Sequence, residues 1–293
     1  MKRKANFEKG KLHRLAAVLE LVYRVDLKST GSFSRVGSSP TRGTKMAKLP
    51  INENFFKNWT SEMSYILGFI VADGCILKRK NRKNSYIFNI TNKEKQHLEK
   101  IKKAMSAAAP LGLKRSGYTK KKDCYFIQIC NKEICKDLIN LGILPRKTYN
   151  LNPIKVPDKY FSDFVRGFFD GDGTVYIYEV NKVSQIKAGF VSSNLSFIIK
   201  FNEQLCENLS IPKKSIHQTT DKRTRRKMTQ YNICFYIDDC EKLAEFMYRD
   251  NFTLYLPRKR RIFERWKSIK RRHYIKQNYP SKIGWRLNQK VFA

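Results

Sequence analysis

YILGFIVADG (residues 65–74) and FVRGFFDGDG (residues 164–173) are the two stretches of this sequence that decide its fold. Both are apolar, and both end in Asp-Gly. Each follows a polar stretch that can begin a helix, with Thr60 and Asp158 as the expected N-caps. Two such copies in one chain indicate an internal repeat, and a repeat determines the architecture before any local pattern does.

The segments that follow the two stretches also correspond. Each copy continues with two strands, a helix that we expect to be capped by Asn92 or Asn194, a second hairpin, a short helix and the sequence LPRK. This order predicts an α+β fold of two pseudo-symmetric αββαββα units, each an antiparallel sheet with helices on one face and the other face free. The expected segments are 75–80, 85–91, 93–107, 124–130 and 132–141, then 174–179, 185–192, 195–208, 231–237 and 241–248.

Composition and repeat boundaries divide the chain into four parts. We expect residues 1–49 to be a basic, largely flexible N-terminal extension, because a run rich in Ser, Gly, Pro and Arg ends it. Residues 50–155 form the first unit and residues 156–267 the second. Residues 268–293 are expected to be a basic C-terminal tail.

The formal net charge is +35, from 60 Lys and Arg against 25 Asp and Glu. An excess of this size favours a polyanionic partner, and the spread of basic residues among strand-like segments favours nucleic acid over a membrane surface; simple solubilisation is the alternative. The seven cysteines form no CxxC pair, which argues against structural zinc. Without a membrane-spanning run or a signal-peptide pattern, we expect an intracellular protein, in a bacterial or archaeal cytoplasm or an organelle, and not a secreted one.

Small residues recur four apart in both apolar stretches and therefore share one helix face. If the two helices pack through these faces, their C-terminal ends meet and Asp73 and Asp172 converge. Two carboxylates at the negative ends of two helices favour a hard divalent cation, with Mg²⁺ the expected ion. The alternative is that each Asp-Gly is only a turn with a left-handed glycine. The small residues are Gly68 and Ala72 in the first copy, and Gly167 and Gly171 in the second.

These paired stretches resemble the signature of the LAGLIDADG homing endonucleases, in the monomeric form that carries two motifs in one chain. The resemblance covers about residues 55–267. It implies two lobes that form a DNA-binding saddle, and it makes Asp73 and Asp172 the catalytic acids. Asp170 stands at the other acidic position of the signature, where the first copy has Val71.

The same resemblance implies the reaction. It predicts a site-specific endonuclease, typical of mobile introns, that hydrolyses both strands of duplex DNA across the minor groove, using divalent metal and water. Lys147 and Lys259, which close the two LPRK sequences, are candidates for a catalytic basic role; phosphate positioning or a cation at a helix end is the alternative. The expected metal site comprises Asp73, Asp172, Ala72 and Gly171.

Sequence recognition is expected on the free sheet faces, because a β-ribbon fits the major groove and reads base edges with alternate side chains. The basic segment 258–272 is expected to hold phosphates, which adds affinity without specificity. Any single surface residue is more often merely solvated, so we treat the candidates as a set. They are Lys78, Arg79, Asn89, Gln128, Tyr178, Gln185, Lys187 and Arg258.

Two other functions remain open within this family. One is an intron maturase, for which a basic surface would bind intron RNA. The other is a catalytically inactive DNA-binding protein of the same fold. The presence of both acids favours the nuclease.

Overall fold

In a computed structural model, the described residues of the chain all lie in one compact unit. The residues that it describes are 49–78, 86–115, 122–148, 150–151, 153–221, 228–249 and 252–278. The predicted N-terminal extension therefore lies outside the described residues except for Leu49, as does the end of the predicted C-terminal tail. No helix among the described residues is both long and apolar enough to cross a membrane.

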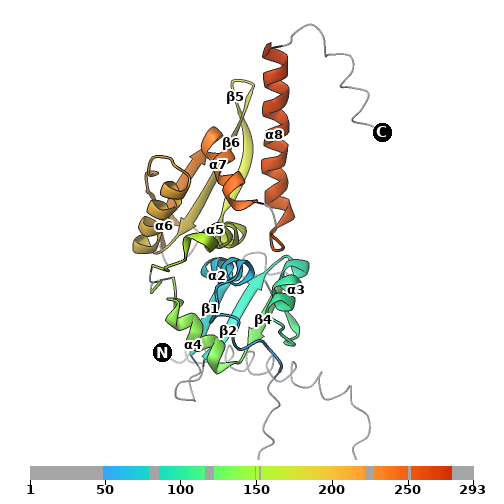
Figure 1. The fold of residues 1–293 in the computed structure, drawn as a ribbon, viewed down its shortest axis with the longest axis vertical. Helices are drawn as coiled ribbons and strands as arrows, with labels where there is room; N and C mark the ends of the chain where they lie inside the picture. Colours follow the sequence, from blue (N-terminus) through green and yellow to red (C-terminus); the bar gives the residue numbers. More distant parts are fainter. Residues whose placement is uncertain are drawn as a thin grey trace, which may run out of the picture. The chain divides into compact units, whose positions relative to one another are not determined.

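The predicted order of elements is confirmed in both repeats (Figure 1). The first repeat consists of α2 (Ser61–Asp73), β1 (Gly74–Lys78), β2 (Tyr86–Asn92), α3 (Lys95–Ala104), β3 (Leu111–Arg115), β4 (Lys122–Ile129) and α4 (Lys132–Asn140). The second consists of α5 (Asp158–Asp172), β5 (Thr174–Val180), β6 (Val183–Ser192), α6 (Leu195–Asn208), β7 (His217–Asp221), β8 (Met228–Tyr236), α7 (Ile237–Met247) and α8 (Pro257–Asn278).

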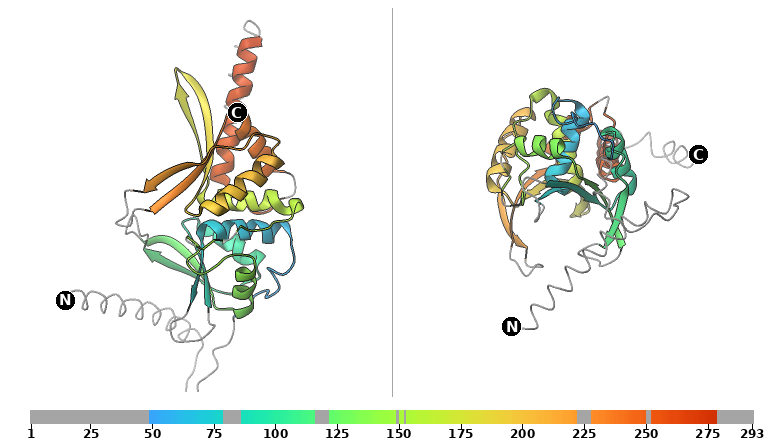
Figure 2. Two further views of the ribbon diagram at one scale, coloured as in Figure 1. Left: turned by 90° about the vertical axis from the view of Figure 1, so that its left-hand side faces the viewer. Right: turned by 90° about the horizontal axis from the view of Figure 1, so that it is seen from below.

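Each repeat builds one four-stranded antiparallel sheet. The strand orders are β1-β2-β4-β3 and β5-β6-β8-β7, so the two sheets share one topology. In each sheet one face packs on the helices and the other is left free of them, as Figure 2 shows for both repeats. The α+β class with two pseudo-symmetric units is thus confirmed.

The helix caps agree with the sequence at two positions and differ at two. Thr60 accepts a hydrogen bond from the Met63 amide at the start of α2, and Asn194 does so from the Phe197 amide at the start of α6. Asp158 is the first residue of α5, after an N-cap at Pro157. Asn92 does not cap α3, whose N-cap position is occupied by Glu94.

Helix α8 has no counterpart among the described residues of the first repeat. It extends for 22 residues and continues across residue 268, where we expected a separate tail to begin. It packs against β5 and α7, with Phe263 and Trp266 buried on that side. The predicted basic segment 258–272 is therefore helical and anchored by apolar contacts.

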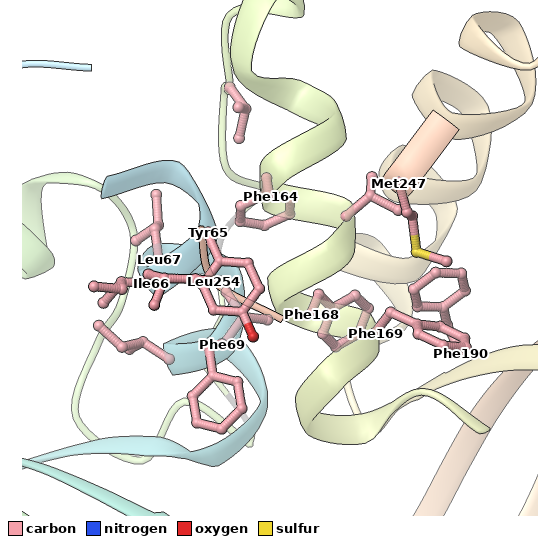
Figure 3. Packing of buried hydrophobic residues seen from close by; sticks show 14 of the residues in the cluster. Tyr65, Ile66, Leu67, Phe69, Phe164, Phe168, Phe169, Phe190, Met247 and Leu254 are labelled. Atoms are coloured by element: carbon pink, nitrogen blue, oxygen red, sulfur yellow. The ribbon is translucent and has the colours of Figure 1, made fainter. Parts of the chain in front are cut away.

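The buried residues of both repeats form one continuous cluster, which passes through the contact between α2 and α5 (Figure 3). In the second repeat, aromatic rings fill its centre: Phe190 packs against Phe168, Phe169, Phe201 and Phe235, with ring centroids 4.9–6.0 Å apart. Contacts of this kind contribute about 0.5–1.5 kcal/mol each beyond the area they bury. This shared core fixes the ends of α2 and α5, from which the candidate site is built.

Candidate active site

Helices α2 and α5 approach each other so closely that only glycine fits at the crossing. A Cβ atom added at Gly68 would meet the Phe164 carbonyl oxygen, and one added at Gly167 would meet the Tyr65 carbonyl oxygen. Further along, a Cβ at Gly171 would meet the Cβ of Ala72. The predicted packing through small residues is therefore confirmed, and Figures 1 and 2 show α2 and α5 side by side.

Asp73 and Asp172 are the last residues of these two helices, and the packing brings their carboxyl groups close enough to repel each other. The glycines that follow are extended, with φ of −89° at Gly74 and −70° at Gly173. They are not left-handed turn residues, so the alternative of two simple turns is wrong. Each glycine instead leads directly from a helix into the first strand of its sheet.

Both acids hold their protons more tightly than a free aspartate. Withdrawal from bulk water, together with the negative charge of Asp172, raises the pKa of Asp73 to about 6, although Asn92, Lys147 and Lys259 oppose the shift. Burial likewise raises the pKa of Asp172, although the positive charges of Lys147 and Lys259 oppose the shift. Raised pKa values of this origin are typical of functional carboxylates.

Lys147 and Lys259 close the C-terminal ends of the two helices. The Lys147 ammonium donates to the carbonyl oxygens of Val71 and Ala72, the latter at 2.6 Å. The Lys259 ammonium donates to several carbonyls at the end of α5, among them Asp170 at 2.9 Å and Gly173 at 2.6 Å. They satisfy carbonyl groups that a helix end leaves without partners, which is the helix-end role that we considered as the alternative.

These contacts also bear on the backbone positions expected to bind metal. The Ala72 carbonyl accepts from Lys147, and the Gly171 carbonyl lies 3.5 Å from the Lys259 nitrogen. Lys259 is buried, and this burial lowers its pKa to about 8 although the nearby acids favour its charge. The site thus holds two carboxylates and two ammonium groups in one cluster.

Asp170, the other acid of the second stretch, has a structural place. Its carboxylate accepts a hydrogen bond from the Tyr65 hydroxyl at 2.7 Å and another from the Leu256 amide at 2.8 Å. It is fully buried, and burial raises its pKa to about 6. Asp170 therefore joins α2, α5 and the segment before α8, and its charge also favours the ammonium form of Lys259.

A large hollow opens beside Asp73. Its volume is about 830 Å³, and its lining includes Lys78, Arg146 and Lys147 as well as Asp73. Lys78 and Arg146 are exposed. A carboxylate at the edge of a hollow with three cations suits a ligand that carries phosphates and a metal ion.

The candidate recognition residues of the first repeat lie on its open sheet face. Asn89 and Gln128 are direct neighbours across β2 and β4, on the face opposite the buried Phe88 and Ile90. The predicted direction of Asn89 is therefore confirmed, but its side chain is only 9% exposed, and it accepts a hydrogen bond from Thr91. Arg79 lies outside the described residues.

The second repeat presents a more polar and aromatic open face. Tyr178 and Gln185 are paired across β5 and β6, and the tyrosine hydroxyl donates to the glutamine side chain at 2.9 Å. Lys187 lies between Tyr176 and Tyr236 in the register, with its ammonium 5.3 Å from the Tyr236 ring centroid. Three predicted residues are thus gathered on one surface.

Arg258 is apart from both sheet faces. Its Nε lies 3.1 Å from a Glu94 carboxylate oxygen, so it links the start of α8 to the start of α3 in the other repeat. The predicted DNA contact at Arg258 would have to compete with this exposed ion pair, which is weak by nature.

Asn92 is the residue of the site that sequence patterns did not reveal. Its side-chain amide donates to the Asp73 carboxylate at 2.6 Å, and its oxygen accepts from the Glu94 amide at 2.9 Å. An Asn at the end of a strand was interpreted only as a helix cap. Nothing in the local pattern indicates a partner at the end of the preceding helix.

The donor set fits a magnesium ion that keeps several waters. Among the described residues, no group of three or more His, Cys, Asp and Glu side chains could enclose a metal. Two carboxylates remain, and Mg²⁺ is typically held by one or two carboxylates together with substrate phosphates and water. Closed all-protein sites, such as those of structural zinc, would need more ligands.

Comparisons with known proteins found a family model, a relative and several solved structures to which the chain is similar. A family model described as a LAGLIDADG-like domain matches residues 60–140. The uncharacterized protein MJ0398 of Methanocaldococcus jannaschii is 25% identical over 236 residues, which cover 76% of this chain and 79% of that protein. Solved structures with a similar fold include the LAGLIDADG meganuclease I-AabMI bound to uncleaved DNA, at 14% identity and a TM-score of 0.47 over 72% of this chain and 91% of that chain. The homing endonuclease I-GzeII in complex with its DNA target has 10% identity and a TM-score of 0.47 over 74% of this chain and 92% of that chain.

The family model and the structure support each other at the level of the repeat. The matched residues include α2, the first sheet and α4, which are the elements that the second repeat duplicates. Residues 60–140 therefore match a LAGLIDADG-like domain, in agreement with the resemblance of the two motifs, and the same order of elements is repeated in residues 158–247.

Proposed function

We propose that this protein is a site-specific homing endonuclease that makes double-strand breaks in duplex DNA and is encoded in a mobile intron. The observation that carries the proposal is the meeting of Asp73 and Asp172 at the packed ends of α2 and α5, one acid from each repeat. A double-strand break requires hydrolysis of one phosphodiester bond in each DNA strand. The two acids, one from each repeat, supply one carboxylate for each of these two bonds. Because one chain supplies both acids, a monomer would suffice.

Mg²⁺ is the proposed cofactor, with Asp73 and Asp172 as its ligands and the Ala72 and Gly171 carbonyls beside it. Bound there, the metal would activate a water molecule and stabilise the leaving oxygen. The chain's own contribution is to orient and neutralise. Asn92 fixes the Asp73 carboxylate, while the ammonium groups of Lys147 and Lys259 offset the charge of the acids and attract a phosphate.

DNA is the proposed substrate because its charge and shape suit the surfaces beside the acids. The chain carries a net charge of +35, and the hollow next to Asp73 is lined by Lys78, Arg146 and Lys147. The open sheet faces carry polar side chains among apolar ones, and side chains on such a face can reach base edges in a groove. Base reading is therefore assigned to Asn89, Gln128, Tyr178, Gln185 and Lys187, with Lys78, Arg79 and Arg258 on the phosphates.

The test is cleavage of a DNA in which the two sequences that flank the reading frame are joined directly to each other. The wild-type protein should convert a supercoiled plasmid carrying this DNA to the linear form in the presence of Mg²⁺ and leave it intact in EDTA. Asp73→Asn and Asp172→Asn should each lower double-strand cleavage by orders of magnitude while DNA affinity in EDTA is kept. Glu99→Gln is the matched control and should cleave normally, because this exposed acid on α3 has its ion pair among the described residues with Lys95.

Full activity in either Asp variant would show that the assigned acids are wrong. A parallel binding comparison of duplex DNA with intron RNA tests the maturase alternative. A clear preference for RNA, without cleavage of DNA, would replace the nuclease by the maturase. Specific DNA binding without cleavage by the wild-type protein would indicate an inactive DNA-binding protein.

A further inference from the structure

A second cavity lies between the two repeats, where α3 meets the start of α8 (Figure 1). Its volume is about 240 Å³, several times the roughly 30 Å³ that one water molecule occupies in the liquid. One wall comes from α3 of the first repeat, with His97 and Lys100. The other comes from α8 of the second repeat, with Arg258 and Arg261. The hollow beside Asp73 has a different lining, so the two cavities are distinct.

The lining has an excess of positive charge. Three cations, Lys100, Arg258 and Arg261, face a single carboxylate, that of Glu94. Glu94 is already engaged by the Nε of Arg258 at 3.1 Å. Lys100 and Arg261 are exposed, and neither forms an ion pair with any described residue. A small cavity with this imbalance favours an anion that carries more than one negative charge.

His97 provides a second, independent indication of a ligand. The residue is 4% exposed, lines the cavity, and its Nδ1 is buried without a hydrogen-bond partner. The other ring nitrogen, Nε2, is 3.0 Å from the Tyr65 hydroxyl, whose proton is donated to Asp170. Nε2 must therefore donate to Tyr65, which leaves Nδ1 of a neutral imidazole as an unused acceptor.

The electrostatic state of His97 agrees with this description. Burial, together with the positive charges of Lys100 and Arg258, lowers its pKa to about 4. The imidazole is therefore neutral at pH 7, and the positive field of the cavity is uncompensated. An anion in the cavity would remove the repulsion between these groups.

The start of α8 adds to the same field. The helix has 22 residues and begins at Pro257, so its N-terminal end and the positive end of its dipole lie in the wall of the cavity. Most amides at this end are already bonded or absent: Pro257 has no N–H, and the Leu256 amide donates to Asp170. The helix end therefore acts on an anion mainly through its dipole, and the arginine side chains supply the donors, because a guanidinium group presents paired N–H groups that match phosphate oxygens.

We propose that this cavity between the repeats binds a phosphate group, separately from the site of Asp73 and Asp172. Lys100, Arg258 and Arg261 supply the charge and the donors, and the positive end of the α8 dipole adds to the field. A hydrogen phosphate can donate its own proton to Nδ1 of His97, whereas a phosphodiester of a nucleic acid has no such proton and is held by the cations alone. A ligand here would link α3 of one repeat to α8 of the other.

The experiment measures binding to the full-length protein in EDTA, so that it is independent of cleavage. Inorganic phosphate is titrated calorimetrically in one arm, and in the other the affinity for duplex DNA is followed as a function of salt concentration. The cavity variant is Lys100→Ala with Arg261→Ala. The matched control is Lys103→Ala with Arg265→Ala, which removes exposed cations about one turn further along the same two helices and outside the cavity.

Phosphate from solution is the ligand if the wild-type and control proteins bind it and the cavity variant binds at least about tenfold more weakly. A nucleic-acid phosphate is the ligand if the cavity variant reduces the magnitude of the slope of log affinity against log salt concentration, and does so by about one unit more than the control variant does. Either result supports the proposal. It is overturned if neither arm separates the cavity variant from the control, and a failure to cleave DNA would not affect this outcome.

Discussion

Replacing Gly167 by alanine tests the packing on which the whole site depends. In a helix interior this substitution normally stabilises by about 1 kcal/mol, because alanine has the higher helix propensity. Here the new Cβ would meet the Tyr65 carbonyl oxygen, with the Tyr65 carbonyl carbon at 2.8 Å and the Phe69 nitrogen at 2.9 Å. All three are backbone atoms, so no side chain can rotate away. The two helices must separate.

The size of the effect follows from these distances. Carbon atoms prefer a separation of about 3.5–4.0 Å, so α2 and α5 must move apart by roughly 1 Å. Overpacking of this kind costs about 1–3 kcal/mol, and more where the backbone must shift. We expect Gly167→Ala to lower the free energy of unfolding by about 2–4 kcal/mol, the opposite sign to that of helix propensity. For a protein of this size the melting temperature should fall by roughly 4–15 °C.

Circular dichroism during thermal and urea unfolding measures the change. Lys159→Ala, an exposed position in the first turn of the same helix, is the control and should stay within about 0.5 kcal/mol of the wild type. Gly68→Ala should match Gly167→Ala, because its Cβ would meet the Phe164 carbonyl oxygen. An alanine variant at Gly167 as stable as the wild type, or more stable, would refute the close crossing and with it the convergence of the acids.

Three further substitutions probe the charges around this crossing. The folded-state pKa of Asp73, about 6, is above its unfolded value. Ionisation of this carboxyl group therefore lowers the free energy of unfolding as the pH rises from about 4 through 6, by at most about 3 kcal/mol. Melting curves in EDTA should show Asp73→Asn more stable than the wild type at pH 8 and similar to it at pH 4. Tyr65→Phe removes a buried donor to Asp170 and should cost about 1–3 kcal/mol in urea unfolding, whereas an unchanged midpoint would show that this hydrogen bond contributes nothing. Arg166→Met leaves a buried Asp163 and two main-chain carbonyls without their donor; it should cost about 3–5 kcal/mol, and a neutral effect would contradict the buried pairing.

The sequence was sufficient to predict the crossing of α2 and α5, because the crossing depends on a short spacing pattern of small residues that occurs in both repeats. Small residues at Gly68 and Ala72, and again at Gly167 and Gly171, lie on one helix face by periodicity alone. The acids follow immediately in each copy, so their convergence needs no further information. Alternation placed Asn89 and Lys187 on the open faces for the same reason.

The partners across the site could not be predicted, because periodicity indicates a face and not the atom opposite it. The hydrogen bond from Tyr65 to Asp170 joins residues 105 positions apart, and the one from Asn92 to Asp73 joins residues 19 apart. Lys147 was assigned by its position in LPRK, but its contacts with helix-end carbonyls depend on where the chain returns after α4. A polar residue at the end of a strand has several plausible roles until the fold selects one.

The two repeats share their packing but differ in how they support the two acids. Asp73 is held by the Asn92 amide, whereas the matching strand of the second repeat ends in Ser192, whose hydroxyl accepts from the Asn194 amide. None of the described residues donates a side-chain hydrogen bond to the Asp172 carboxylate, so Lys147 and Lys259 act on it only through their charge. A change at Gly68 or Gly167 would separate both acids at once, which constrains the crossing in both copies. A change beside one acid affects mainly that acid, so the surroundings of the two carboxylates could diverge after duplication while their meeting point was kept.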